Sequence, residues 1–322
     1  MFLEVEGVSK GYGSLAVLGD ISFAAAEGEL VSIVGPSGAG KTTLLKILAG
    51  LEEADAGMVR CQADLERNPA ILVFQDYLLF PTMTVFDNVA FGLRCRKAGK
   101  KMIGKRVADM LDYFQLGQKA KFYPAQLSAG QQQRVALARA MVVEPSLLLL
   151  DEPFANLDRN LKAETAEFIR SFQQEYTITT ISVTHDLQEA FMMSDKIGIM
   201  LSGELCQFDT VESVYHRPVS RHVAGFLGHV NIVPGHCLHD VDVQIPAELN
   251  NTTIGVRAES IELKADASGS GVIADVLFAG HFIIYRVQLR DIILRVYSFR
   301  CDHQVGDRVS IHIKHCIQMK EN

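Results

Sequence analysis

Apolar residues alternate with helical patterns over the first two thirds of the chain. Four short apolar runs have the length and composition of buried strands: 30–34, 70–74, 147–150 and 179–183. The segment 41–50 follows the first of them, ends in a glycine and predicts a helix. Strands that alternate with helices indicate a parallel sheet covered on both faces. We therefore expect an α/β domain over residues 1–228.

The pattern changes after residue 228. Short β-type runs follow one another there, separated by Gly, Asn, Asp and Ser: 241–243, 254–256, 272–276, 283–289, 292–297 and 309–313. Such spacing is typical of small all-β domains. We expect a small β-barrel or sandwich over residues 229–322.

Composition narrows the class of protein. The chain has 322 residues, is 48% hydrophobic and 21% charged, and carries a net charge of −7, which argues against a nucleic-acid partner. It contains no apolar stretch of membrane-spanning length and begins without a secretory signal pattern. Its six cysteines form no C-x-x-C pair and are interpreted as free cytosolic thiols.

The segment 35–42 matches the phosphate-loop pattern G-x-x-x-x-G-K-[ST], between a predicted strand and a predicted helix. Glycines let backbone N–H groups face phosphate oxygens, and the helix N-terminus adds positive potential. Lys41 offers a charge for the β- and γ-phosphates, and the Thr42 hydroxyl is a ligand for Mg²⁺. A glycine-rich turn before a core helix would not explain this context. The predicted nucleotide-binding residues are Gly35, Pro36, Ser37, Gly38, Ala39, Gly40, Lys41, Thr42 and Thr43.

Two acids follow the apolar run 147–150. Asp151, at the end of that strand, is positioned to hold Mg²⁺. Glu152 is then positioned to polarise a water toward the γ-phosphate as general base. An ordinary acidic loop is the alternative, but a nucleotide site needs a metal ligand at a neighbouring strand end.

Further motifs resemble those of the ABC transporter ATPases, in the order and spacing of that family and over nearly the whole chain. The run 127–134, Leu-Ser-Ala-Gly-Gln-Gln-Gln-Arg, resembles the LSGGQ signature, and 155–158 resembles the D-loop. Gln75 resembles the Q-loop glutamine, His185 the switch histidine, and Tyr12 the aromatic residue that stacks on adenine. Ser128 is also a good N-cap for a helix with apolar residues at helical spacing.

The resemblance implies a homodimeric, Mg²⁺-dependent ATPase with a head-to-tail arrangement around two ATP molecules. It implies that Ser128, Gly130, Gln131 and Asp158 contact nucleotide across the dimer. It also implies that Gln75 and His185 act with Glu152 in catalysis, and that Thr42, Gln75 and Asp151 hold the metal.

The chain departs from the family pattern at two positions. Ala129 replaces the first signature glycine, and an alanine tolerates a left-handed backbone poorly. Ala155 replaces the usual D-loop serine, which removes a hydrogen bond across the dimer. A lower hydrolysis rate is one consequence to test.

The segments 76–85, 226–235 and 255–261 resemble the importer branch that carries a C-terminal TOBE-type domain. The resemblance implies a helical subdomain over about 76–145, where Leu79 and Phe80 receive a permease subunit. It implies uptake of ferric iron, polyamine, sulfate/thiosulfate or molybdate with an extracytoplasmic solute-binding protein, and a cytoplasmic location on the inner face of the membrane. The alternative is a stand-alone ABC ATPase that acts on a soluble partner.

Histidines are concentrated in the C-terminal segment, together with three cysteines: His229, His236, His239, His281, His303, His312 and His315. Neither His236-Cys237-x-His239 nor His312-x-x-His315-Cys316 matches a zinc signature. We interpret them as surface histidines; the alternative is a domain that binds a transported metal.

Overall fold

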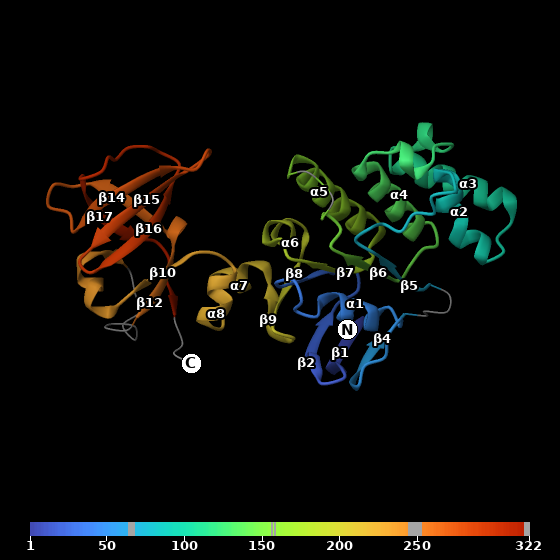
Figure 1. Ribbon diagram of the computed structural model, residues 1–322, viewed down its shortest axis with the longest axis horizontal. Helices are drawn as coiled ribbons and strands as arrows, with labels where there is room; N and C mark the ends of the chain where they lie inside the picture. Colours follow the sequence, from blue (N-terminus) through green and yellow to red (C-terminus); the bar gives the residue numbers. More distant parts are fainter. Residues whose placement is uncertain (64–67, 156, 158, 244–252, 319–322) are drawn as a thin grey trace. The chain divides into compact units, whose positions relative to one another are not determined.

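A computed structural model describes residues 1–63, 68–155, 157, 159–243 and 253–318 (Figure 1). The chain divides into two compact units, Met1–Val211 and Glu212–Asn322. The first is the expected α/β domain and the second the expected β domain.

The first unit is built on a six-stranded sheet in the order β5-β6-β7-β3-β8-β9. Its first five strands are mutually parallel, and only β9 pairs antiparallel. The bounds are β3 (Leu30–Val34), β5 (Ala70–Val73), β6 (Leu147–Asp151), β7 (Thr179–Thr184), β8 (Lys196–Leu201) and β9 (Glu204–Thr210). The four strands predicted from apolar runs are confirmed.

Both faces of this sheet are buried, because successive side chains of a strand point to opposite sides. In β6, Leu147 and Leu149 belong to one hydrophobic cluster, whereas Leu148 and Leu150 belong to another. A continuous apolar run is therefore what a strand covered on both faces requires.

One face is covered by a second, antiparallel sheet and helix α1 (Lys41–Leu48) (Figure 1). This sheet has the order β2-β1-β4, with β1 (Leu3–Tyr12), β2 (Leu15–Ala25) and β4 (Ala56–Cys61). This second sheet was not predicted from the sequence.

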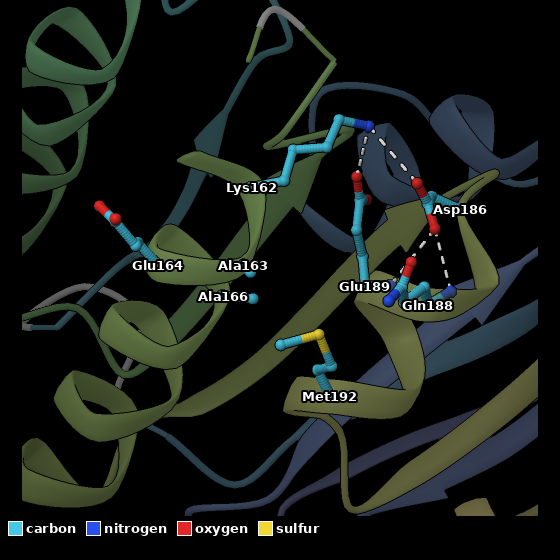
Figure 2. Close-up of a pocket in the computed structure, with 8 residues that line it drawn as sticks. All are labelled: Lys162, Ala163, Glu164, Ala166, Asp186, Gln188, Glu189 and Met192. Atoms are coloured by element: carbon cyan, nitrogen blue, oxygen red, sulfur yellow. Dashed lines mark hydrogen bonds and ion pairs between the residues drawn. The ribbon is translucent and has the colours of Figure 1, made fainter. Parts of the chain in front are cut away.

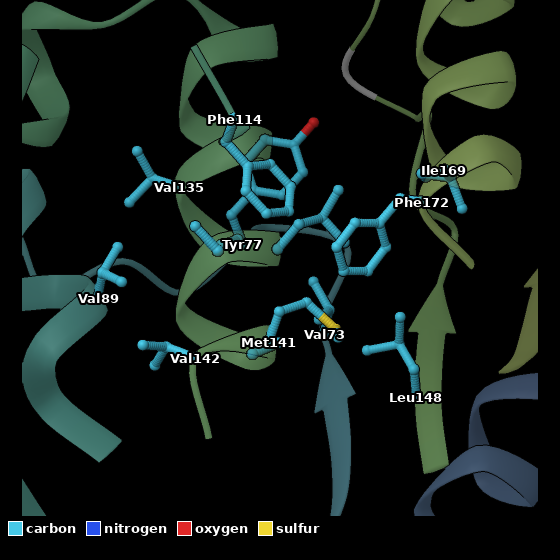
Figure 3. Close-up of a cluster of buried hydrophobic side chains, with 14 of the residues drawn as sticks. Val73, Tyr77, Val89, Phe114, Val135, Met141, Val142, Leu148, Ile169 and Phe172 are labelled. Carbon is cyan, nitrogen blue, oxygen red and sulfur yellow. The ribbon is translucent and has the colours of Figure 1, made fainter. Parts of the chain in front are cut away.

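The other face is covered by helices of the expected helical region and by α5 (Figures 1 and 3). Val73 of β5 and Leu148 of β6 pack there with Val135, Met141 and Phe172. The helices are α2 (Val85–Cys95), α3 (Lys100–Tyr113), α4 (Ala129–Met141), α5 (Arg159–Tyr176) and α6 (Leu187–Met193), with short 3₁₀ turns η1 (Gly117–Lys119) and η2 (Pro124–Gln126).

The second unit contains two sheets around one apolar core. Their orders are β10-β12-β18 and β11-β17-β14-β15-β16, and β13 pairs with β17. The strands are β10 (Val230–Val233), β11 (Asp242–Val243), β12 (Ile254–Arg257), β13 (Ile261–Ala265), β14 (Gly271–Phe278), β15 (Ile283–Leu289), β16 (Ile292–Ser298), β17 (Arg308–Ile313) and β18 (Ile317–Gln318), with 3₁₀ turns η3 (Gly235–Asp240) and η5 (Ala258–Ser260).

Helices α7 (Val211–His216) and α8 (Arg221–Phe226) precede these strands. The buried guanidinium of Arg257 lies 4.0 Å from the ring centroid of Tyr215 and donates to the carbonyl oxygens of Tyr215 and Ala224. Both helices are thereby tied to the β domain. The compact unit consequently begins at Glu212, earlier than the sequence boundary at 228/229.

Candidate active site

The phosphate loop and four other predicted site residues lie at one edge of the central sheet. β3 leads into the phosphate loop 35–40, and β6 ends at Asp151, which Glu152 follows. His185 follows β7, and Gln75 lies just beyond β5. Since these four strands are parallel and adjacent, their carboxyl ends share one edge. Ligands of open α/β sheets bind at this edge.

Two glycines shape the phosphate loop. A Cβ at Gly35 would lie 2.1 Å from the carbonyl oxygen of Met200, and a Cβ at Gly40 would lie 2.7 Å from that of Val17. Gly40 also has a φ of +95°, in the left-handed region that favours glycine. The loop then enters α1, whose unpaired N–H groups and dipole attract anions.

Lys41, the first residue of α1, is buried at the loop. Its Nζ donates to the carbonyl oxygens of Gly35 (2.8 Å) and Pro36 (3.0 Å). Burial lowers the pKa of this ammonium, and the nearby carboxylates of Glu152 and Asp151 oppose that change. The lysine thus contacts neutral carbonyl groups, which leaves its charge for an anionic ligand.

Thr42 and Asp151 join the loop to β6. The Thr42 hydroxyl donates to Oδ1 of Asp151 over 3.1 Å. Burial raises the pKa of Asp151, and the hydrogen bond from Thr42 lowers it. Hydroxyl and carboxylate oxygens are the donors that Mg²⁺ prefers, so this pair fits that metal.

Glu152 and His185 form the second cross-strand pair. Nδ1 of His185 lies 3.1 Å from Oε2 of Glu152. The backbone N–H of Glu152 donates to the carbonyl oxygen of Val183, and its φ is +44°, which is uncommon for a residue with a side chain. The Glu152 carboxylate is 18% exposed and the His185 ring 50% exposed. The pair is therefore open to a ligand.

A pocket of about 280 Å³ lies over the loop. Its lining comes from the loop, α1 and the strand ends: Val17, Ser37, Gly38, Gly40, Lys41, Thr42, Thr43 and Glu152. Asp151 and His185 each contact a lining residue. Gly35, Pro36 and Ala39 complete the loop without lining the pocket. Gln75 is exposed and lies outside the lining.

Tyr12 ends β1 and is 49% exposed. Its hydroxyl is hydrogen-bonded to Glu52, which raises the pKa of Tyr12, and a weaker bond to Thr43 opposes that change. Thr43 lines the pocket, so the ring lies near its rim.

The signature segment begins α4, as predicted. Oγ of Ser128 accepts from the N–H of Gln131, and the Gln131 side chain accepts from the N–H of Ser128. A Cβ at Gly130 would lie 2.8 Å from Cδ2 of Leu161. None of these residues lines the pocket over the phosphate loop of the same chain.

Comparisons with known proteins agree with this geometry. Residues 18–155 match the family described as ABC transporter, and residues 254–316 match the TOBE domain. The chain is 45% identical over 245 residues to the sulfate/thiosulfate import ATP-binding protein CysA of Bacillus cereus, which covers 73% of this chain and 69% of the relative. The chain belongs to the ABC transporter family of ATP-binding proteins.

Two further relatives extend the match. The Fe(3+) ions import ATP-binding protein FbpC of Photorhabdus laumondii is 35% identical, covering 97% of this chain and 95% of the relative. The dimeric bacterial ABC transporter cassette MJ0796 has 30% identity and a TM-score of 0.58, covering 65% of this chain and 98% of that structure. This ABC protein is therefore an ATP-binding ATPase of the import type. No helix in the described ranges is both long and apolar enough to span a bilayer.

The structure settles one departure of this ABC ATPase from its family pattern. Ala129 is the first residue of α4 and does not adopt the left-handed conformation. Its methyl group therefore causes no backbone strain. Ala155 is exposed, and Asp158 lies outside the described residues.

Sequence reasoning missed a group of polar residues behind His185. Nζ of Lys162 on α5 lies 2.8 Å from Oε1 of Glu189 and 3.4 Å from Oδ2 of Asp186, as Figure 2 shows. The Thr184 hydroxyl donates to Oε2 of Glu189 (2.7 Å) and accepts from the N–H of Asp186. The two neighbours of His185 are thus held by one network anchored on α5.

This network has no signal in the sequence, because its members come from separate elements and fit no motif. The same holds for Gln133 on α4, which is buried and donates to the carbonyl oxygen of Pro153 over 2.7 Å. That bond connects the signature helix to the segment directly after Glu152.

Proposed function

We propose that this ABC ATPase is the Mg²⁺-ATP-hydrolysing subunit of a solute importer and acts as a homodimer on separate permease subunits. The observation that carries the proposal is the meeting of the phosphate loop, Asp151 and the Glu152–His185 pair at one sheet edge. The names of its relatives support the direction of transport.

The phosphates of ATP would bind at the loop and the N-terminus of α1. Lys41 provides the charge for the β- and γ-phosphates, and Tyr12 at the rim offers its ring to adenine. Thr42 and Asp151, with Gln75, would hold Mg²⁺. When bound, that ion neutralises charge on the phosphate oxygens.

Glu152 is proposed as the general base. It takes a proton from a water whose oxygen forms a bond to the γ-phosphorus. The bond from that phosphorus to the β–γ bridging oxygen breaks, and the oxygen leaves with ADP. His185 holds the Glu152 carboxylate through Nδ1, and in its protonated form the ring has Nε2–H left for a γ-phosphate oxygen.

A second copy of the chain would complete the site. The N-terminus of α4 is capped by the exposed Ser128, and neither Ser128, Gly130 nor Gln131 lines its own chain's pocket. A helix N-terminus suits the γ-phosphate of a partner. The dimeric MJ0796 cassette supports this arrangement. ATP binding would then close the dimer, and hydrolysis would reopen it.

An apolar groove of about 460 Å³ suits a permease segment. It lies where β5 faces α2 and α4, and its lining includes Leu78, Phe80 and Phe91. The Phe80 and Phe91 rings are 4.6 Å apart, and Arg139 holds the carbonyl oxygens of Tyr77 and Leu78. Exposed apolar surface of this kind marks interaction sites.

The expectation that Leu79 and Phe80 are exposed is wrong for Leu79, and Phe80 is only half-exposed. Leu79 packs against the core cluster, because the turn after β5 directs Leu78 outward instead. Leu78 and Tyr77 both have positive φ, and the guanidinium of Arg139 fixes that turn.

For the solute, the relatives favour an inorganic ion: sulfate or thiosulfate for CysA, and ferric iron for FbpC. An extracytoplasmic binding protein would deliver it, and this subunit would lie on the cytoplasmic face of the membrane.

Affinity capture of the tagged chain from native membranes in mild detergent tests the proposal. Phe91→Glu places a charge in the groove, while Met102→Glu changes another exposed apolar residue, on α3 outside the groove. We expect a multi-span permease to be recovered with the parent chain and with Met102→Glu, but not with Phe91→Glu. Recovery of soluble partners alone, with a control transporter intact, would instead favour the stand-alone ATPase.

A further inference from the structure

Three metal-ligand side chains converge in the second unit at a place with no assigned role. His236 and Cys237 lie in η3, directly after β10, and Asp291 lies in the turn between β15 and β16. The segments are more than 50 residues apart in the sequence, yet Asp291 contacts both other residues.

The donor atoms have spacings suited to a single small cation. Nε2 of His236 lies 3.2 Å from Oδ1 of Asp291, and Sγ of Cys237 lies 3.9 Å from the same oxygen. One ligand atom from each residue lies within 4.8 Å of the others. A tetrahedral zinc ion separates its N, O and S ligands by about 3.3–3.5 Å. Small side-chain rotations would therefore bring all three onto one ion.

We propose that His236, Cys237 and Asp291 bind a borderline divalent cation of the zinc class. A thiolate and a carboxylate together neutralise a divalent charge, and imidazole completes a donor set that zinc favours. Three protein ligands leave a fourth position for water. The site belongs to the β domain and does not depend on the proposed transport function.

The surrounding contacts keep the ligands in position. Leu289 pairs with Ile292, so Arg290 and Asp291 form a two-residue turn, in which Arg290 has a φ of +50°. Arg290 forms an ion pair with Asp240 at the end of η3. Cys237 is buried against the core, whereas His236 and Asp291 are 54% and 68% exposed. The thiol thus forms the floor of the site, and the exposed pair covers it.

The grouping differs from both spacings considered in the sequence. His312 pairs with Asp242 at 2.9 Å, and His315 contacts the carbonyl oxygen of His216 at 3.3 Å. His239 does not belong to the group, and its place is taken by Asp291. The interpretation of surface histidines holds for His315, which is exposed, but is wrong for His303, which is buried. The proposal concerns His236 alone among the seven histidines.

Titration of the full-length chain with Co²⁺, after chelator treatment and without nucleotide, tests the site. A thiolate-to-cobalt charge-transfer band reports the Cys237 sulfur as a ligand, and Zn²⁺ should displace one equivalent of Co²⁺. We expect His236→Ala and Asp291→Asn to weaken Co²⁺ binding at least about a hundredfold, since even second-shell changes cost 10–100-fold. Cys237→Ala should abolish the band.

Matched controls come from the same unit. His239→Ala removes an exposed histidine of η3, and Cys301→Ala removes an exposed thiol, and both should bind Co²⁺ within about twofold of the parent. The two variants that change exposed ligands, His236→Ala and Asp291→Asn, should keep the parental circular dichroism spectrum. Absence of the band in the folded parent, or a band that persists in His236→Ala and Asp291→Asn, would overturn the proposal.

Discussion

Nδ1 of His185 lies 3.1 Å from Oε2 of Glu152, and the two residues follow adjacent strands of the central sheet. This contact places an ionisable pair at the mouth of the pocket over the phosphate loop. An imidazole that donates through Nδ1 orients the carboxylate of Glu152. The pair thus has the geometry of a general base and its orienting partner.

Glu152→Gln should lower kcat for ATP hydrolysis by about 10²–10⁴-fold, the usual contribution of a general base. Its KM for ATP should change little, because the loop and Lys41 remain. Steady-state phosphate release measures both constants. Glu27→Gln, at an exposed position in another turn, is the control and should keep parental kinetics. Parental turnover in Glu152→Gln would assign the base elsewhere.

The Glu152→Gln variant also tests whether two copies of the chain share one nucleotide site. Glu152→Gln with Mg²⁺ and ATP should form a dimer that size-exclusion chromatography with light scattering detects. The double variant Lys41→Ala/Glu152→Gln should stay monomeric, because the loop has lost its cation. A monomer of Glu152→Gln that retains bound ATP would contradict the head-to-tail arrangement.

Asp151→Asn should separate stability from activity. Burial raises the pKa of Asp151, so the charged form is disfavoured in the folded protein at neutral pH. The protonated carboxyl group of Asp151 contributes to stability at acidic pH. This contribution is lost as the pH rises through the raised pKa of Asp151. We therefore expect the nucleotide-free variant to melt about 2–4 °C higher at neutral pH, with a smaller difference in acid, and to lose hydrolysis. Thermal melts across pH that show no such difference would contradict this explanation.

Lys162→Met should reduce kcat without raising KM, because Lys162 holds Asp186 and Glu189, which fix the two chain neighbours of His185. A tenfold decrease is a reasonable expectation for a positioning residue, about 1.4 kcal/mol in the barrier. Lys162→Arg keeps the charge and should recover most of kcat. Equal loss in both variants, or a change confined to KM, would argue against positioning.

Ala129→Gly should leave kcat within about twofold, because the backbone at this position is helical. The variant should lose up to about 1 kcal/mol of unfolding free energy, since glycine disfavours helix. Urea unfolding and ATPase assays measure the two effects. A large gain in kcat would show that the alanine itself limits turnover.

The sequence predicted the parts of the site that are local. The glycines, Lys41 and Thr42 are contiguous, and an apolar strand such as 147–150 can only be buried on both faces. Residues from separate motifs, such as Gln75 and His185, were predicted to belong to the site from the family resemblance. Strand order then explains why they share one edge.

Long-range polar contacts could not be predicted. Lys162 and Glu189 are 27 residues apart and follow no spacing rule, and His236 and Asp291 are 55 apart. The early start of the β domain depends on Arg257, whose buried contacts with α7 and α8 have no pattern in the sequence. The alternation of apolar and polar residues and the spacing of motifs depend on residues that are close in the sequence. The contacts named here depend instead on how helices and strands pack in space.

The most direct test of the account is solute uptake by the captured complex, reconstituted in vesicles with its binding protein and supplied with ATP on the cytoplasmic side. Labelled sulfate, thiosulfate and ferric ion would be offered in parallel. We expect ATP-dependent accumulation of one of them by the parent complex and none by the Glu152→Gln complex. Accumulation that is equal in both complexes, or ATP hydrolysis that drives none of these solutes, would contradict it.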